Sequence, residues 1–145
     1  MENNDKAIRA TGGCLCGAVR YEVRGSLRPV IACHCTQCRR TSGHFVAATA
    51  TAPDNLVLVE KKGLSWYQSS SFARRGFCRT CGSSLFWERT EGASDHISIM
   101  TGTLDSPTGL ETEMHIYVED AGDYYKINDG LPQKTGHEHR VATPK

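Results

Sequence analysis

The sequence lacks long apolar runs and any strong excess of one charge. Its 145 residues contain no stretch near the roughly 18 apolar residues that a membrane-spanning helix requires, so we expect none. Residues 1–13 are polar and hold no apolar signal-peptide core, which predicts a cytoplasmic protein. The formal net charge is +1, so no global field attracts nucleic acid or an anionic membrane. We therefore expect neither partner.

Internal repeats and long helical patterns are also missing. Short segments rich in alternating Val, Ile, Tyr and Phe are separated by Gly, Pro, Asn, Asp and Ser, which is typical of strands joined by turns. One short helix is expected at 36–41. The expected strands are 18–23, 45–51, 56–60, 65–68, 85–88, 96–100 and 114–118. This pattern predicts a mainly β fold, and the length suits a single domain.

What the sequence does have is seven cysteines, which the reducing cytoplasm would keep as free thiols. An odd number also cannot pair completely into disulfides. A redox role of the thioredoxin type would need a βαβ pattern, which is missing. Metal binding is therefore the leading explanation. The cysteines form three clusters: Cys14 and Cys16; Cys33, Cys35 and Cys38; and Cys78 and Cys81.

The first and third clusters together supply two close pairs, as a structural zinc site requires. Such a site takes four thiolates in a tetrahedron at about 2.3 Å from the ion. Gly17 follows the first pair and Gly82 follows the second, and glycine adopts without penalty the positive φ that a turn around a metal needs. We predict a closed zinc site whose ligands are Cys14, Cys16, Cys78 and Cys81.

The middle cluster supplies three ligands and has no fourth cysteine, which is the arrangement of a catalytic zinc with one exchangeable position. His34 lies between Cys33 and Cys35, but in an extended segment its side chain points to the opposite face. His34 could be the fourth ligand, but we favour an open fourth position, with His34 at most tuning the site from outside the ligand set. An alternative partition exchanges one member of this cluster with the Cys14–Cys16 pair.

Charged and imidazole side chains near the clusters are further candidates. Arginine suits bidentate contact with a carboxylate, although surface arginines are commonly only solvated. The arginine candidates are Arg39, Arg40, Arg74 and Arg75. The possible proton carriers are His44, His96 and His115. His115 lies in an alternating segment where packing is the commoner role. No general base is assigned, and we expect His137 and His139 to be solvated rather than ligands.

Three thiolates already donate strongly to a metal, so the middle cluster should polarise water poorly, which argues against a hydrolase. It suits capture of a substrate thiol as a fourth thiolate, because a coordinated thiol loses its proton. The resulting thiolate is the nucleophile of sulfur chemistry. The cluster therefore favours carbon–sulfur addition to a carbonyl, or its reversal.

Five runs in this sequence also resemble one known family in the same order. They are GGCLCGAVRY at 12–21, CHCTQCRR at 33–40, FCRTCGS at 77–83, HIYV at 115–118 and DGLP at 129–132. The sequence resembles the glutathione-dependent formaldehyde-activating enzyme family, whose domain is shared with centromere protein V. The resemblance extends from about Gly12 to Pro132.

The resemblance implies an antiparallel β fold like that of the zinc-binding exchange factor Mss4, with two zinc ions. It implies a structural zinc on the four-cysteine set and a catalytic zinc on the triplet. The family joins glutathione and formaldehyde to S-(hydroxymethyl)glutathione, as a carbon–sulfur lyase acting in reverse. The expected organisation is an extension at 1–11, a zinc-binding domain at 12–132 and a flexible tail at 133–145. The alternative is a non-catalytic, zinc-stabilised protein-binding module of the same fold.

Overall fold

The computed structural model describes residues 6–92 and 95–136. Within them the strands are β1 (Ala10–Gly13), β2 (Arg20–Val23), β3 (Val30–Cys33), β4 (Val46–Thr51), β5 (Leu56–Glu60), β6 (Leu64–Gln68), β7 (Ala73–Cys78), β8 (Ser84–Arg89), β9 (Ile97–Met100) and β10 (Thr112–Ile116). The helices are α2 (Thr36–Ser42) and the 3-10 turns η1 (Pro53–Asn55), η2 (Thr101–Thr103) and η3 (Val118–Asp120). No helix of this part of the chain has the length and apolar character needed to cross a membrane.

The mainly β, antiparallel fold that the sequence predicts is confirmed, and so is the one short helix. Three strands were not predicted. β1 ends in two glycines, β7 carries two arginines and a glycine, and β3 has only four residues. None of the three alternates clearly, so their pairing depends on neighbouring strands rather than on local preference. The comparison with Mss4 stays a prediction.

The chain forms two compact units that each combine two stretches of sequence. The first takes the residues up to Arg28 together with 49–109, and the second takes 29–48 together with the residues from Leu110 onward. Neither unit is one continuous stretch, so neither could be excised as an independent segment. This agrees with the predicted single domain.

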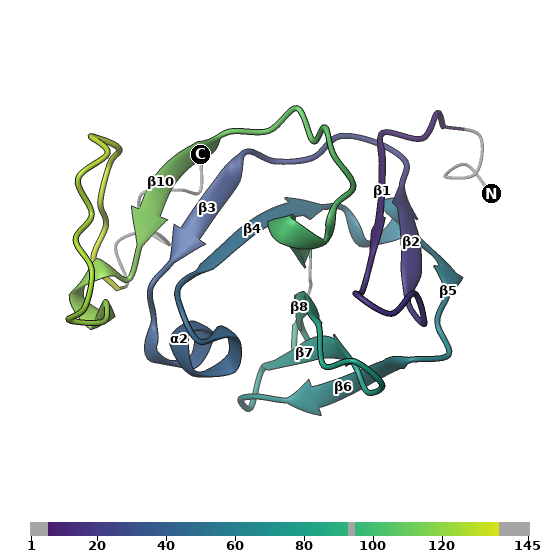
Figure 1. Cartoon of the computed structure of the whole chain (residues 1–145), viewed down its shortest axis with the longest axis horizontal. Coiled ribbons are helices and arrows are strands. Elements are labelled where there is room, and N and C mark those ends of the chain that lie inside the picture. The colour runs from purple at the N-terminus through teal and green to yellow at the C-terminus, as the bar shows by residue number, and fades with distance from the viewer. Residues whose placement is uncertain (1–5, 93–94, 137–145) are drawn as a thin grey trace. The chain divides into compact units, whose positions relative to one another are not determined.

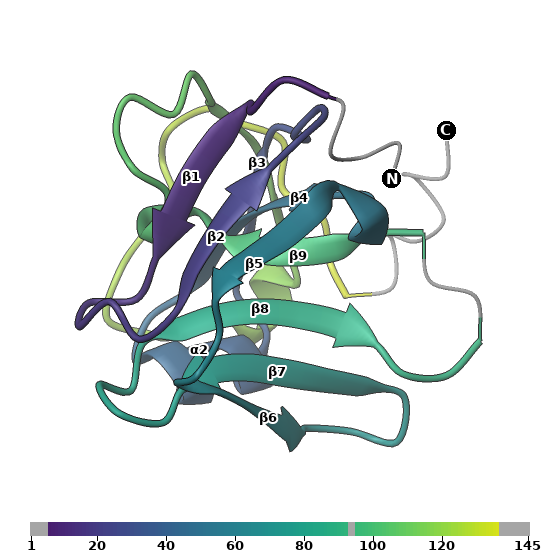
Figure 2. The same ribbon diagram turned by 90° about the vertical axis from the view of Figure 1, so that its right-hand side faces the viewer.

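The first unit holds two antiparallel arrangements of strands. β2 lies between β1 and β5, and β6, β7, β8 and β9 pair in chain order, as Figure 2 shows. Tyr21 and Phe86 are at most 1% exposed and meet edge to face, with their ring centres 5.4 Å apart. The Tyr21 hydroxyl lies 2.6 Å from the Thr103 hydroxyl, so this buried polar group has a partner.

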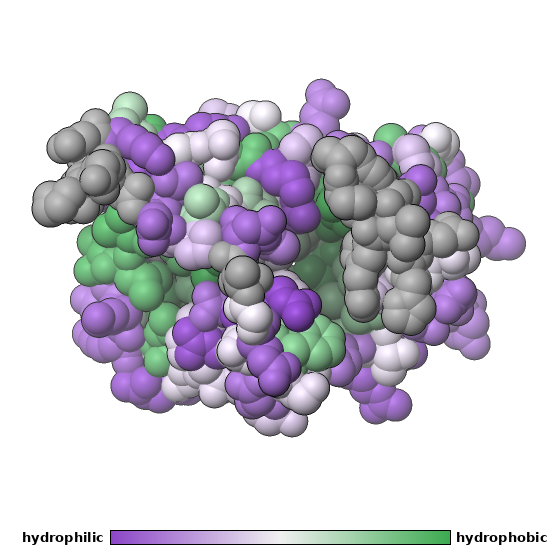
Figure 3. All heavy atoms as spheres, turned by 180° about the vertical axis from the view of Figure 1, so that it is seen from behind, coloured by the Kyte–Doolittle hydropathy of each residue, from purple (hydrophilic) through white to green (hydrophobic). Residues whose placement is uncertain are grey.

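The edge strand β5 exposes apolar side chains. Hydrophobic residues gather over this strand in Figure 3, at the left of the view. Val59 is 59% exposed, and Ile8, which precedes β1, is 47% exposed. Single exposed apolar side chains are common on soluble proteins.

The second unit is centred on β3. β3 pairs antiparallel with Val46–Ala48 of β4 on one side and parallel with β10 on the other, and α2 follows it directly (Figure 1). The parallel pairing places His115 beside Ala32, so two segments far apart in sequence become neighbours.

Backbone pairing in this unit continues past the predicted end of the domain at residue 132. Gln133 forms a bridge with His115, and the Lys134 N–H donates to the carbonyl of His115 at 2.9 Å. The remaining part of the predicted tail, with His137 and His139, lies outside the described residues. A flexible tail there stays a prediction.

Gly63 tests how tightly the first unit packs around Cys78. A Cβ at Gly63 would lie 2.7 Å from the Cβ of Ala18 and 2.9 Å from the sulfur of Cys78. We expect Gly63→Ala to lower the free energy of unfolding by about 1–3 kcal/mol through overpacking. Denaturant unfolding measures this. The matched control is Gly102→Ala, where a Cβ meets open space and little change is expected. Equal stability of the two variants would contradict the tight packing.

Candidate metal centres

Two turns of the first unit bring together Cys14, Cys16, Cys78 and Cys81. Their sulfur atoms all lie within 4.8 Å of one another. The sulfur of Cys16 lies 3.7 Å from that of Cys14 and 3.8 Å from that of Cys78. Four sulfurs held tetrahedrally at about 2.3 Å from an ion stand about 3.8 Å apart, so the cluster has the dimensions of a thiolate metal site.

Glycine shapes both turns, as the sequence predicts. Gly17 has φ 88° and Gly82 has φ 83°, which is the left-handed region. The Gly82 N–H donates to the carbonyl of Cys78 at 2.7 Å, and this bond closes the second turn. In the first turn the Val19 N–H donates to the sulfur of Cys14 at 3.2 Å. Such N–H groups stabilise a thiolate.

Local hydrogen bonds also favour the ionised form of Cys81. The hydroxyl of Ser83 lies 3.2 Å from the Cys81 sulfur. This hydroxyl and the Ser83 backbone N–H lower the pKa of Cys81 to about 5. The thiolate, rather than the thiol, is the form that binds metal. At neutral pH this ligand is therefore already prepared for a cation.

The second unit carries the other cluster at the junction of β3 and α2. Cys33 ends β3, Cys35 caps α2, and Cys38 is buried in the first turn of the helix. The three sulfurs lie within 4.8 Å of one another. Hydrogen bonds with Cys35 and Cys38, together with burial, raise the pKa of Cys33. Three crowded thiols resist ionisation until a cation compensates their charge.

The seven cysteines therefore fall into the two groups that the spacing predicts, with no member exchanged between them. Each group could hold a metal ion. The ligand roles stay predictions. Cys33 and Cys35 are half-buried, whereas Cys14 and Cys78 of the other group are buried.

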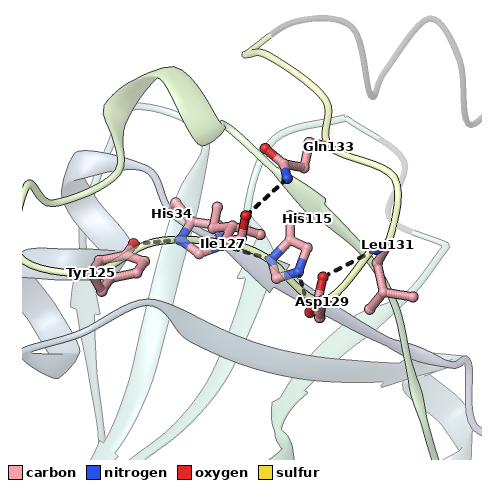
Figure 4. Close-up of polar contacts among 7 residues, drawn as sticks. All are labelled: His34, His115, Tyr125, Ile127, Asp129, Leu131 and Gln133. Carbon is pink, nitrogen blue, oxygen red and sulfur yellow. Dashed lines mark hydrogen bonds and ion pairs between the residues drawn. The ribbon is translucent and has the colours of Figure 1, made fainter.

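His34 is fully buried and belongs to neither group of candidate ligands. Its Nε2 lies 2.9 Å from Nδ1 of His115, and its Nδ1 lies 2.5 Å from the hydroxyl of Tyr125 (Figure 4). Nε2 of His115 in turn lies 2.9 Å from Asp129. Burial, and then the nearby His115 and His44, lower the pKa of His34 to about 4. It is therefore neutral at physiological pH.

Sequence reasoning missed Tyr125 and Asp129. They lie about 90 residues beyond His34, in a segment without strand or helix. Asp129 begins the DGLP run of the family resemblance, but neither residue was assigned a role from the sequence. His115 was expected to be packed or hydrogen-bonded, and it is both buried and bonded on each ring nitrogen. The available signal was the clustering of Tyr, Asp and Gly after a strand that bears a histidine.

The other histidine and arginine candidates differ in their partners. His44 is exposed, with Nδ1 2.8 Å from the Tyr124 hydroxyl, and His96 pairs with Asp95. Arg74 is engaged by Glu88 and stacks over Trp66, 3.9 Å from the ring centre.

The two arginines after Cys38 lie on α2. Arg40 is exposed, whereas Nε of Arg39 is buried and makes no hydrogen bond among the described residues.

Comparison with known proteins finds one matching family and similar proteins in other organisms. Residues 9–120 match the model of a family described as glutathione-dependent formaldehyde-activating enzyme. An uncharacterised lyase of Schizosaccharomyces pombe is 29% identical over 115 residues, which cover 79% of this chain and 82% of the relative. A Halomonas elongata protein with the provisional name of glutathione-dependent formaldehyde-activating enzyme is 29% identical over 125 residues. The match covers 80% of this chain and 79% of the relative.

The fold is also similar to a crystal structure of a Rhodobacter sphaeroides protein. The TM-score is 0.56 at 24% sequence identity, and the match covers 85% of this chain and 98% of the other. At this identity the likeness supports the fold alone.

Metal content separates the two clusters experimentally. We expect two metal ions per chain, measured by mass spectrometry of the purified protein, and one in either Cys81→Ser or Cys35→Ser. Loss of the four-cysteine metal should lower stability by several kcal/mol, because a structural metal contributes directly to folding. Loss of the three-cysteine metal should cost much less. A single ion in the wild type, retained in Cys35→Ser, would contradict the second site.

Proposed function

Because this chain belongs to the glutathione-dependent formaldehyde-activating enzyme family, we propose that it is a carbon–sulfur lyase that joins a thiol such as glutathione to a small aldehyde. The family membership confirms the resemblance seen in the sequence. With formaldehyde the product would be S-(hydroxymethyl)glutathione, and the reverse reaction would release both components. The observation that carries this proposal is a three-cysteine cluster separate from the four-cysteine one.

Both clusters fit zinc. Soft thiolate ligands in a tetrahedron select zinc or an iron–sulfur cluster, and the four-cysteine spacing matches single-ion coordination. Cys14, Cys16, Cys78 and Cys81 would hold a structural zinc, and Cys33, Cys35 and Cys38 a catalytic one. When bound there, zinc would supply a positive charge that lowers the pKa of a thiol at its fourth position.

The three-cysteine set favours thiol chemistry over hydrolysis. Three thiolates neutralise and polarise a divalent ion more than three imidazoles do, so water at the fourth position stays weakly acidic. A thiol is far more acidic than water and can still be ionised there. A non-catalytic binding module would need only the four-cysteine set, and a second set of three cysteines supports the enzyme.

Arg39 is the candidate contact for a carboxylate of glutathione. It directly follows Cys38 in α2, and its backbone N–H donates to the carbonyl of Cys35. A guanidinium group whose Nε has no hydrogen-bond partner among the described residues can donate two parallel hydrogen bonds to a carboxylate. Arg74, by contrast, is already engaged by Glu88.

Turnover can be measured even though thiols and formaldehyde react spontaneously. Nuclear magnetic resonance with carbon-13 formaldehyde reports the exchange rate between free aldehyde and its glutathione adduct. We expect zinc-loaded protein to raise this rate, and Cys35→Ser to reduce it to the uncatalysed value. Other small thiols define the specificity. An unchanged exchange rate with protein that contains both zinc ions would contradict the proposal.

Substitution of Arg39 tests the carboxylate contact. We expect Arg39→Gln to raise KM for glutathione about tenfold or more, because a charge-assisted hydrogen bond contributes about 1.5–3 kcal/mol. The matched control is Arg40→Gln, which removes the neighbouring exposed charge and should leave KM nearly unchanged. Equal effects of the two substitutions would indicate a general electrostatic contribution rather than a specific contact.

A further inference from the structure

The three-stranded sheet of the first unit ends in an edge strand with a single partner. The strand order is β1, β2, β5, so β5 pairs with β2 on one side only. Figure 2 shows the three strands side by side. Among residues 6–92 and 95–136, no segment forms a backbone hydrogen bond with the other edge of β5. Within that part of the chain, this edge is therefore unpaired.

The direction of the unpaired backbone groups follows from their neighbours. The Arg24 N–H donates to the carbonyl of Asn55 at 2.8 Å, so this carbonyl faces β2. The carbonyl of Val23, opposite Leu56, instead accepts at 2.7 Å from the residue that precedes β1. Because backbone groups alternate in direction along an antiparallel strand, the N–H and C=O of Leu56 and Leu58 point away from β2. Such a row of unpaired groups is a template for a further strand.

Two other edge strands of the same unit are covered. β1 forms a bridge with Leu104, and the Asp105 N–H donates to the carbonyl of Thr11 at 2.9 Å. At the start of β6, the Arg79 side chain donates to the carbonyl of Leu64 at 3.3 Å. The outer edge of β5 has no comparable contact with any described residue. This strand is thus the edge of the first unit that is suited to pair with another chain.

The side chains along this edge are apolar. Leu56 and Leu58 lie opposite the buried Val23 and Tyr21, yet both leucines stay partly exposed. Val59 occupies a bulge in the pairing with β2 and is 59% exposed. A single exposed valine is common, whereas apolar side chains along an unpaired strand favour association with a further strand. A strand added here would cover the leucines as well as the backbone.

The charges at the two ends of β5 indicate which strand fits. Asp54 lies exposed before the strand, and Lys61 and Lys62 lie exposed after it. Glu60 accepts a hydrogen bond from the Lys62 N–H at 3.1 Å, and the two lysines outnumber this one acid. An antiparallel second copy centred on Leu58 brings Asp54 of each chain toward Lys62 of the other. The charges of β5 are therefore complementary to those of β5 itself.

We propose that β5 is the contact surface of a homodimer, in which two copies of this chain pair antiparallel and join their three-stranded sheets into one. The contact uses residues of the first unit and none of the candidate metal ligands, so it is independent of the proposed lyase activity. A contact between two short strands is small beside the ~1,600 Å² of a standard interface. We therefore expect the dimer to form and dissociate with protein concentration.

Sedimentation equilibrium of the full chain, as purified, measures this association. The mass should rise with concentration from 15.9 kDa to twice that value. We expect Val59→Lys to raise the dissociation constant about tenfold or more, because it brings two like charges into an apolar contact. The matched control is Tyr67→Lys, which changes a 63% exposed side chain on the covered strand β6 and should leave the constant unchanged. Both positions are exposed, so the melting temperature of the monomer should stay that of the wild type.

A charge exchange tests the antiparallel arrangement. Asp54→Lys and Lys62→Asp should each raise the dissociation constant about threefold or more at low salt, because each puts like charges opposite one another at both ends of the contact. The double variant restores opposite charges and should return the constant to the wild-type value. A substitution that acted by disturbing the fold of the monomer would not be rescued in this way.

Hydrogen exchange identifies the strand directly. The amides of Leu56 and Leu58 should exchange rapidly in dilute protein and slowly at concentrations where the dimer forms. A monomer at every concentration, or a dimer unaffected by Val59→Lys, would overturn the proposal. Slow exchange of these amides in the monomer would also overturn it, because another segment of the same chain would then cover the edge. None of these outcomes depends on whether the protein acts on glutathione.

Discussion

Four cysteine sulfurs within 4.8 Å of one another would repel strongly as thiolates unless a cation lay among them, and the turns of the first unit converge on that point. Two turns must converge on one point, each with a glycine at positive φ. Gly63 lets the backbone pass close to Cys78, where no side chain would fit. The N–H groups that face sulfur have no role without ionised thiols. A metal bound at this cluster would therefore add to the stability that the apolar core gives this unit.

The other cluster has the same chemistry in a different setting. Three cysteines at the junction of a strand and a short helix leave one position of a tetrahedral metal without a ligand from the described residues, and two of them are only half-buried. The first cluster would complete a tetrahedral site by itself, whereas the second would need one further ligand. This difference in ligand number distinguishes a site that holds the fold together from one that can exchange a ligand.

The sequence predicted those features that depend on neighbours in the chain. Cysteine spacing and the following glycines indicated the two groups of sulfurs, and the apolar alternation of 56–60 and 85–88 indicated strands. The strand at 10–13 was missed because two glycines hide its pattern. Tyr125 and Asp129 were missed for another reason. Tyr125 is 91 residues from its partner His34, and Asp129 contacts His115, which is itself 81 residues from His34. The parallel pairing of β3 with β10 brings the strand before His34 beside His115.

The segment Cys33–Cys35 carries two cysteines of the triplet and, between them, the buried histidine His34. Because side chains alternate in an extended chain, the geometry that directs Cys33 and Cys35 to one face directs His34 to the other. Two candidate metal ligands and a buried histidine thus occupy three consecutive residues, and a shift of this backbone would move both together. His34 is fully buried and bonded at both ring nitrogens, so the segment has little freedom to shift. The hydrogen bonds of His34 therefore also restrain the positions of the neighbouring sulfurs, as the partners around a metal site restrain its ligands.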